Sequence, residues 1–259
     1  MSLSRRTFLS LTPTALIVRQ SPPTATASPS IPSTFPSHDP DLAREMVSVS
    51  HGNVARVREL LADHPALANA AWDWGYGDWE SALGAASHVG NREIAGLLLA
   101  AGARASIFSA TMLGQLDVVR AFIAAAPGVQ KTRGPHGITL LAHAKAGGAG
   151  AAEVAKYLES LGDADPRYTN ETLADADKTA IAGVYRFGTA PSQRFTVAAG
   201  ERGMSIQREG YVARGLLHLG DRVFHPVGAM AVRVRFGSGQ RASTLTIEDG
   251  SLVVKAERV

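Results

Sequence analysis

Histidine is the residue type in this sequence best suited to proton transfer or metal binding, since the chain has eight histidines and no cysteine. His136 and His143 lie seven residues apart, and so do His218 and His225. Neither pair has the spacing of four residues that places two imidazoles on one face of a helix for a metal ion. Local spacing therefore predicts no metal ligands, and it leaves open only a site assembled from residues distant in the chain.

Known catalytic and cofactor motifs are absent from the sequence. It has no Gly-x-Ser-x-Gly nucleophile elbow, no phosphate-binding glycine loop and no dinucleotide fingerprint, because the glycine-rich run 147–150 lies inside a helical repeat with no strand before it. We therefore predict a protein that is not an enzyme, with no catalytic residues and no cofactor.

One short segment has the residue types of a binding surface. All three tryptophans lie in residues 71–80, with one tyrosine and three acidic residues. Trp and Tyr supply binding energy at little entropic cost, and the acids suit a partner that carries Lys or Arg, or a polar glycan. The candidate partner-binding residues are Trp72, Asp73, Trp74, Tyr76, Asp78 and Trp79. In the alternative interpretation, the rings fold back and shield the edge of a small helical core.

Internal repeats indicate the elements that position this segment. Glycine anchors are followed, four and eight residues later, by mostly apolar pairs, which predicts a helix with one buried stripe after each anchor. The anchors Gly52, Gly90, Gly114 and Gly150 precede Arg56 and Leu60, Ile94 and Leu98, Val118 and Phe122, and Val154 and Leu158. Gly102 and Gly162 are expected to take the left-handed conformation that ends a helix.

A second short helix is expected before two of these anchors, in residues 81–86 and 139–144. These segments resemble the Thr-Pro-Leu-His-x-Ala core of ankyrin repeats, and the resemblance covers about residues 41–165. It implies about four stacked helix pairs, with residues 72–80 as a finger at the edge of a concave binding surface. The sequence departs from the family where Gly84 and Ala142 replace the histidine and where Glu45 takes a core position in the first repeat.

The periodicity changes after Pro166. Residues 166–180 are polar and are expected to form a linker, and residues 181–259 contain about seven short alternating segments separated by glycine turns. This pattern predicts a small antiparallel β-barrel. The expected strands are 184–187, 194–197, 204–207, 217–219, 232–236, 245–248 and 252–254. The outward positions of these strands include Arg186, Arg233 and Arg235, which are expected to form a basic face.

The C-terminal segments 181–185, 219–224 and 245–250 look like the accessory β domain that follows the catalytic domain in exported, β-lactamase-like serine hydrolases. That resemblance rests on apolar and turn positions and implies no chemistry. The Ser-x-x-Lys nucleophile motif of those enzymes is absent from the sequence.

The N-terminus has the features of an export signal. Residues 4–9, Ser-Arg-Arg-Thr-Phe-Leu, resemble the bacterial twin-arginine motif, a short apolar run follows, and residues 25–27 offer a small-x-small cleavage site. We therefore expect a signal peptide in residues 1–27, a Pro/Ser-rich linker in residues 28–40 and a periplasmic or otherwise exported protein.

The net charge of +3 comes from this leader, because residues 28–259 carry equal numbers of acidic and basic residues. Nucleic acid is therefore not expected as a partner, and no apolar run is long enough for an integral membrane span.

The sequence as a whole predicts an α+β protein: an all-α ankyrin repeat solenoid followed by a small antiparallel β-barrel-like domain. We expect a non-enzymatic interaction module that binds an unidentified protein through the concave face and residues 72–80. The alternative is a protein that binds a small ligand or a cell-wall fragment, or assists an enzyme, through the β domain or the domain junction.

Overall fold

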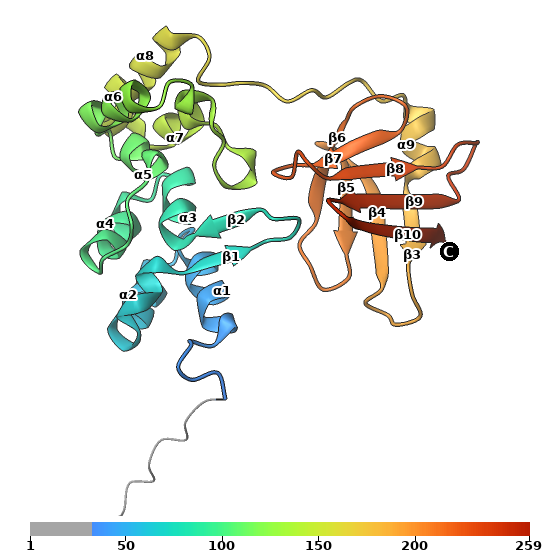
Figure 1. The fold of residues 1–259 in the computed structure, drawn as a ribbon, viewed down its shortest axis with the longest axis horizontal. Coiled ribbons are helices and arrows are strands. Elements are labelled where there is room, and N and C mark those ends of the chain that lie inside the picture. Colours follow the sequence, from blue (N-terminus) through green and yellow to red (C-terminus); the bar gives the residue numbers. More distant parts are fainter. Residues whose placement is uncertain (1–32) are drawn as a thin grey trace, which may run out of the picture. The chain divides into compact units, whose positions relative to one another are not determined.

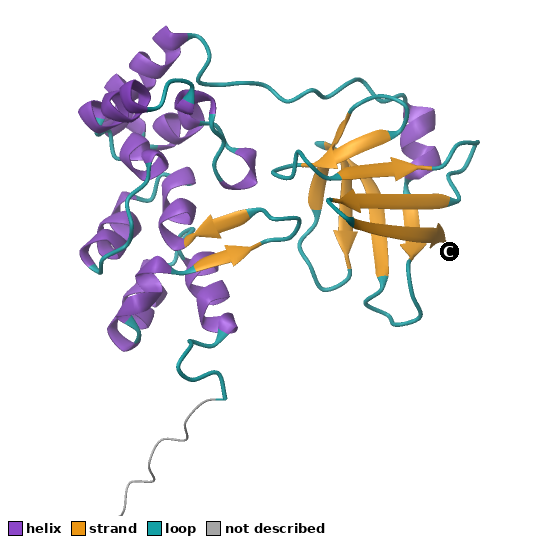
Figure 2. Ribbon diagram, viewed as in Figure 1, coloured by secondary structure: helices purple, strands orange, loops and turns teal. Residues whose placement is uncertain are grey.

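The computed structural model describes residues 33–259, in which His38–Val259 form one compact unit. The predicted signal peptide, with its twin-arginine motif and cleavage site, and residues 28–32 of the predicted linker lie outside the described residues. Helices come first along the chain and a β-barrel follows (Figures 1 and 2). Among residues 33–259, no helix has both the length and the hydropathy needed to cross a bilayer.

Residues 40–161 form helices in consecutive pairs (Figure 1). Most helices begin at a side chain that accepts a hydrogen bond from a free backbone N–H of the first turn, as at Asp39, Asn53 and Asn91. The pairs are α1 (Pro40–Val49) with α2 (Val54–Asp63), α3 (Ala82–His88) with α4 (Arg92–Ala100), α5 (Ile107–Met112) with α6 (Leu116–Ala125), and α7 (Leu140–Ala146) with α8 (Ala152–Leu161).

The first helices of successive pairs contact each other, α1 with α3, α3 with α5 and α5 with α7. Two of the anchor glycines allow close approaches to the fourth helix pair. Gly90 and Gly114 have φ angles of +76° and +77°, and a Cβ atom would overlap the carbonyl oxygen of Ala146 at Gly90 and that of Gly150 at Gly114. These two anchors are therefore glycine for both conformation and packing.

The apolar stripes expected after the glycine anchors are buried in three helices and displaced in α6. Leu60, Leu98 and Leu158 are buried, whereas Val118 and Phe122 are exposed and Val119 is the fully buried residue of α6. In this helix the expected stripe is therefore wrong at the fourth and eighth positions after Gly114, and only its fifth position, Val119, is buried. Because α6 has apolar residues on several sides, its sequence does not single out one face.

The C-terminal strands form a closed barrel in the order β10-β3-β4-β5-β6-β7-β8-β9, and every neighbouring pair is antiparallel. The β-barrel expected from the sequence is thus confirmed. Its strands are β3 (Gly183–Arg186), β4 (Arg194–Gly200), β5 (Gly203–Arg208), β6 (Arg214–His218), β7 (Val223–Pro226), β8 (Arg233–Phe236), β9 (Thr244–Asp249) and β10 (Leu252–Arg258).

The barrel has eight strands, whereas the sequence predicted about seven. The strand that the sequence did not predict is β7, which has only four residues and ends at Pro226. It follows a tight turn in which Asp221 and Arg222 have positive φ angles. The strand is therefore too short and too close to the turn to be recognised from the sequence.

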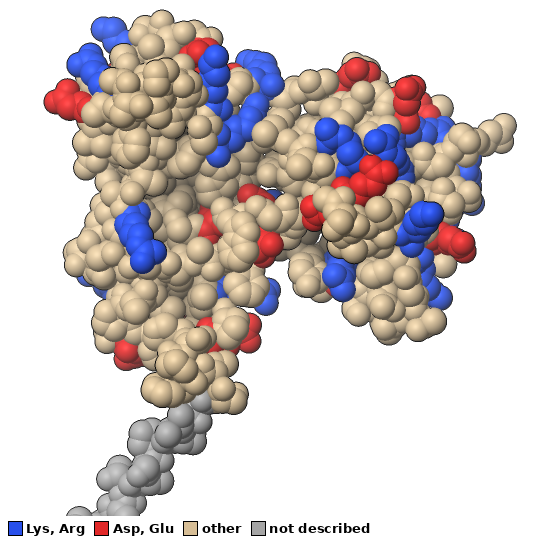
Figure 3. Space-filling model, in the orientation of Figure 1, with Lys and Arg blue, Asp and Glu red and all other residues tan. Residues whose placement is uncertain are grey.

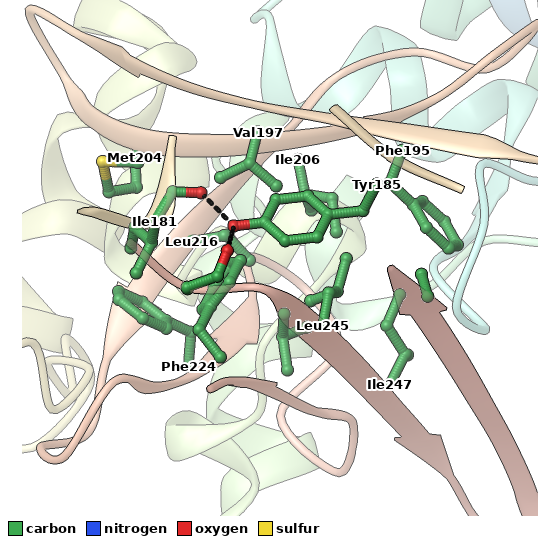
Figure 4. Packing of buried hydrophobic residues seen from close by; sticks show 14 of the residues in the cluster. Ile181, Tyr185, Phe195, Val197, Met204, Ile206, Leu216, Phe224, Leu245 and Ile247 are labelled. Atoms are coloured by element: carbon green, nitrogen blue, oxygen red, sulfur yellow. Dashed lines mark hydrogen bonds between the residues drawn. The ribbon is translucent and has the colours of Figure 1, made fainter. Parts of the chain in front are cut away.

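The expected linker 166–180 ends in a helix, α9 (Asp175–Ile181), that packs on the barrel. Ile181 is fully buried in the barrel core, and its carbonyl oxygen accepts a hydrogen bond of 2.7 Å from the Tyr185 hydroxyl (Figure 4). Ala242 and Arg258 also contact that hydroxyl, which satisfies the one polar group of a buried ring.

The expected basic face of the barrel also carries acidic residues. Arg235 lies 3.3 Å from the Glu248 carboxylate, and Arg233 is the cross-strand neighbour of Glu248. Figure 3 shows red side chains among the blue ones over the barrel in this view. Because acidic residues lie among the arginines, the positive potential of this face is reduced, which disfavours an anionic polymer as partner.

Candidate functional site

The tryptophan-rich segment forms a β-hairpin from β1 (Ala71–Asp73) and β2 (Trp79–Ser81). Trp72 pairs with Glu80 and Asp73 with Trp79, and the turn between the strands contains Gly75 and Gly77 at positive φ. Because side chains alternate along a strand, β2 exposes Trp79 and Ser81 and buries Glu80 between them.

The structure separates the six residues predicted to bind a partner. Trp79 is 64% exposed and Asp78 only 4%, and the other four are partly buried. Trp72 and Trp74 pack against the core of the first helices, and Tyr76 packs against the barrel core, where burial raises the pKa of its hydroxyl to about 12. Trp72 and Trp74 thus lie as the alternative interpretation expected, against the helical core, whereas the contact of Tyr76 with the barrel was not expected.

Asp78 forms a buried ion-pair cluster with His136 and Arg214. Its carboxylate lies 2.5 Å from Arg214 Nη1 and 2.7 Å from His136 Nδ1, and it also accepts a 2.8 Å hydrogen bond from the backbone N–H of His136. His136 has a φ of +58°, which is unusual for a residue other than glycine. In this conformation its backbone N–H and its ring Nδ1 both face Asp78. The cluster joins the hairpin, the turn 135–137 and strand β6.

The charges of this cluster follow from burial and pairing. Burial disfavours the ionised form of Asp78, but hydrogen bonds from His136 and the charge of Arg214 outweigh it, so the pKa of Asp78 is lowered. Burial also disfavours the His136 imidazolium, yet hydrogen bonds to Asp78 and Glu80 raise its pKa to about 9.

Next to this cluster, His51, Glu80, His88 and His136 direct one nitrogen or carboxylate oxygen each at a common point, with all four atoms within 4.8 Å of one another. His88 Nε2 lies 3.1 Å from His51 Nε2 and 2.9 Å from Glu80 Oε1. Glu80 Oε2 lies 3.5 Å from both His51 Nε2 and His136 Nε2. Three imidazoles and a carboxylate are metal-ligand types, so these residues could hold a metal ion.

The helix pairs and the hairpin bring these four residues together. His51 follows α1 and His88 ends α3, so both lie at the ends of first helices that contact each other. Glu80 is the inward residue of β2, and His136 lies in the turn before α7. Local spacing could not reveal this group, but one signal was present: His51 and His88 stand one and two residues before repeat glycines.

A cleft leads to this group. One cavity of about 310 Å³ is lined by His51, Trp74, His136, Val212, Ala213 and Arg214. A second cavity, of about 240 Å³, shares Trp74, Val212 and Arg214 with the first. Its other lining residues are Gly75, Tyr76, Phe187, Phe195, Ile206, Arg208, Tyr211, Ile247, Asp249, Leu252 and Val254. The hairpin and the barrel therefore line a joint cleft, largely apolar, with two arginines and one aspartate.

Some buried polar atoms at the site have no hydrogen-bond partner within residues 33–259. They are the Nε and Nη2 atoms of Arg214. A buried polar group without a partner costs about 1–3 kcal/mol, and more when it is charged. Atoms of this kind often mark the place of a ligand or ion.

Comparison with known proteins adds no family: neither protein-family models nor curated proteins match this chain. The function of the protein is therefore inferred from the geometry of the site.

Proposed function

We propose that the protein binds a small organic anion with an apolar or aromatic body in the cleft between the hairpin and the barrel. The observation that supports this proposal is the joint lining of one cavity by Trp74 and Tyr76 of the hairpin and by Phe187, Phe195 and Tyr211 of the barrel. Small-molecule sites are typically concave and apolar, with a few polar groups that fix orientation.

The two arginines of the cavity indicate the charge of the ligand. Arg208 lies over the rings of Phe187 and Tyr211, at 5.5 Å and 5.1 Å, and Arg214 has one of its nitrogens on Asp78 and two without a partner. Asp249 is the acid in the same wall. A guanidinium next to aromatic faces suits a carboxylate, sulfonate or phosphate on a ring.

Anilinonaphthalene sulfonate has this chemistry and reports binding by its fluorescence. We expect saturable binding to the full-length protein, loss of binding in Val212→Trp, and weaker binding in Arg208→Gln. Val212 and Arg208 are exposed, so both variants should fold. The matched control is Arg202→Gln, an exposed arginine in the β4–β5 turn. Equal binding by wild type and Val212→Trp would refute the proposal.

We also propose that residues 41–165 are an ankyrin repeat array and that the barrel is related to the accessory domain of β-lactamase-like hydrolases. Four helix pairs, glycines between the helices of a pair and a hairpin before α3 support the first relation. The twin-arginine-like residues 4–9 support export to the periplasm. A fusion of residues 1–40 to a reporter that needs folded export would test this, with Arg5→Lys/Arg6→Lys as the control.

A second candidate function is the binding of a protein partner through the hairpin, without catalysis. The observation that favours it is Trp79, the first residue of β2, which is 64% exposed. In an affinity pull-down from periplasmic extract, Trp79→Ala should lose a partner that wild type and Val253→Ala both retain. Val253 is a suitable control because it is 52% exposed on the barrel and lies outside the lining of the cleft. Equal capture by all three proteins would exclude Trp79 as a contact.

A further inference from the structure

We propose that His51, Glu80, His88 and His136 bind one divalent transition-metal ion, with zinc as the best fit. The proposal rests on the convergence of their ligand atoms and is independent of the proposed organic ligand. Three arguments support it: the distances between the ligand atoms, the outer contacts of the imidazoles, and the polarity of the space around them.

The distances match those of a coordination sphere. Tetrahedral zinc with bonds of about 2.0–2.1 Å places its ligand atoms about 3.3–3.4 Å apart. The Nε2 atoms of His51 and His88 lie 3.1 Å apart, and His88 Nε2 lies 2.9 Å from Glu80 Oε1. The other carboxylate oxygen, Glu80 Oε2, lies 3.5 Å from the Nε2 atoms of His51 and His136. An ion fits at the common point with small side-chain adjustments.

The outer nitrogens of two imidazoles are held as in known metal sites. His51 Nδ1 lies 3.0 Å from the carbonyl oxygen of Ser48, so it must be the N–H donor, and the lone pair of the neutral ring lies on Nε2. His136 Nδ1 likewise donates to Asp78 at 2.7 Å, although Arg214 Nη1 lies 3.3 Å from the same nitrogen. Since Arg214 can only donate, the carboxylate determines the proton position. A ligating histidine characteristically donates its other N–H to a carboxylate or a carbonyl.

A buried carboxylate at the centre of this group needs a positive charge. Glu80 is 1% exposed, Trp74 Nε1 donates to its Oε2 atom at 2.7 Å, and its Oε1 atom lies 2.9 Å from His88 Nε2. A metal ion bound to the Glu80 carboxylate and to the three Nε2 atoms would satisfy all of them at once. Without an ion, Glu80 is held by the Trp74 indole and by the imidazoles around it.

The ligand set and its access indicate which ions suit the site. Three imidazoles exclude a good fit to Ca²⁺ or Mg²⁺, which prefer oxygen ligands, and favour zinc and neighbouring transition metals. His51 and His136 line the 310 Å³ cavity beside Arg214, so a bound ion would be open to the cleft. Such an ion would act as a Lewis acid toward an anion that enters there.

The test is zinc binding by the full-length protein after removal of metals with a chelator, measured by calorimetry and by metal content. We expect one zinc per chain. His88→Gln should weaken binding by about 100-fold or more, since loss of an outer contact alone costs about 10–100-fold. His64→Gln is the matched control, because His64 pairs with His38 outside the group. It should bind zinc as wild type does.

A second variant protects the test against misfolding. The side chain of His51 is 33% exposed, so His51→Gln removes a ligand at the edge of the group, and circular dichroism of the metal-free proteins checks the fold. Wild type that binds no zinc, or binds it no more tightly than folded His51→Gln and His88→Gln, would overturn the proposal. The four side chains would then be an ion-pair network only.

Discussion

The carboxylate of Asp78 and the guanidinium of Arg214 lie 2.5 Å apart, although 136 positions separate them in the sequence. Asp78 comes from the hairpin, Arg214 begins strand β6, and both are less than a tenth exposed. This ion pair connects the helical and barrel parts of the compact unit, and it forms one wall of the cleft through Arg214.

Breaking this pair on one side should be costly. Asp78→Asn leaves the Arg214 charge buried without compensation, so we expect a loss of about 3–5 kcal/mol in the free energy of unfolding. The double variant Asp78→Asn/Arg214→Gln should cost less than the sum of the two single variants. The measurement is urea unfolding, with Arg194→Gln as the control, since that arginine pairs with Glu209 at the surface and should contribute less than about 1 kcal/mol. Additive single effects would contradict a direct pair.

Gly90 should tolerate alanine much less well than Gly102. Both have positive φ, at +76° and +89°, but a Cβ at Gly90 would overlap the Ala146 carbonyl whereas nothing lies within 4 Å at Gly102. Gly102→Ala therefore pays only for backbone strain, about 1–2 kcal/mol. Gly90→Ala should cost clearly more because α3 and α7 must separate. Equal losses in urea unfolding would show that close packing does not explain the anchor glycine.

His143 should make the protein less stable in mild acid. Burial lowers its pKa to about 4, against an ordinary value of about 6.5, although its Nδ1 bonds the Thr139 carbonyl. The unfolded chain takes up this proton first as pH falls, so the contribution of His143 is fully present above pH 6.5 and is lost between pH 6.5 and 4. The expected loss reaches up to about 3 kcal/mol.

The comparison of wild type with His143→Gln by urea unfolding at pH 7 and pH 5 isolates this effect from other titrating groups. The variant should lose less stability over this interval than wild type. A steeper loss in the variant would mean that the folded protein binds the His143 proton at least as well as the unfolded chain.

The sequence predicted the elements better than it predicted the site. The helices after Gly52, Gly90, Gly114 and Gly150 follow from local rules of burial and hydrogen bonding. The same rules did not predict which face of α6 is buried, because α6 is apolar on several sides. They also did not predict strand β7, because it is only four residues long. Rules based on neighbouring residues carry little information where packing between elements determines which face of a helix is buried or whether a short strand forms.

The candidate metal ligands show the same limit more strongly. His51, Glu80, His88 and His136 lie in four different elements or turns, and only the contact of α1 with α3 and the fold of the hairpin bring them together. No spacing rule contains this information. The tryptophan-rich segment, by contrast, can be recognised from composition alone. The burial of its rings depends on the helical core and the barrel core, whose positions beside the hairpin the sequence does not reveal.

We infer that a metal ion at His51, Glu80, His88 and His136 opens onto a cleft for an organic anion. Cobalt tests both parts at once, because the visible absorption of Co²⁺ reports its ligands. We predict that full-length, metal-free protein binds one Co²⁺ with visible bands that His88→Gln lacks, and that phenyl phosphate shifts these bands in wild type but not in Val212→Trp. If phenyl phosphate leaves the bands of wild type unchanged, the result contradicts a cleft shared by the metal ion and the anion. If no bands appear, the result contradicts the metal site itself.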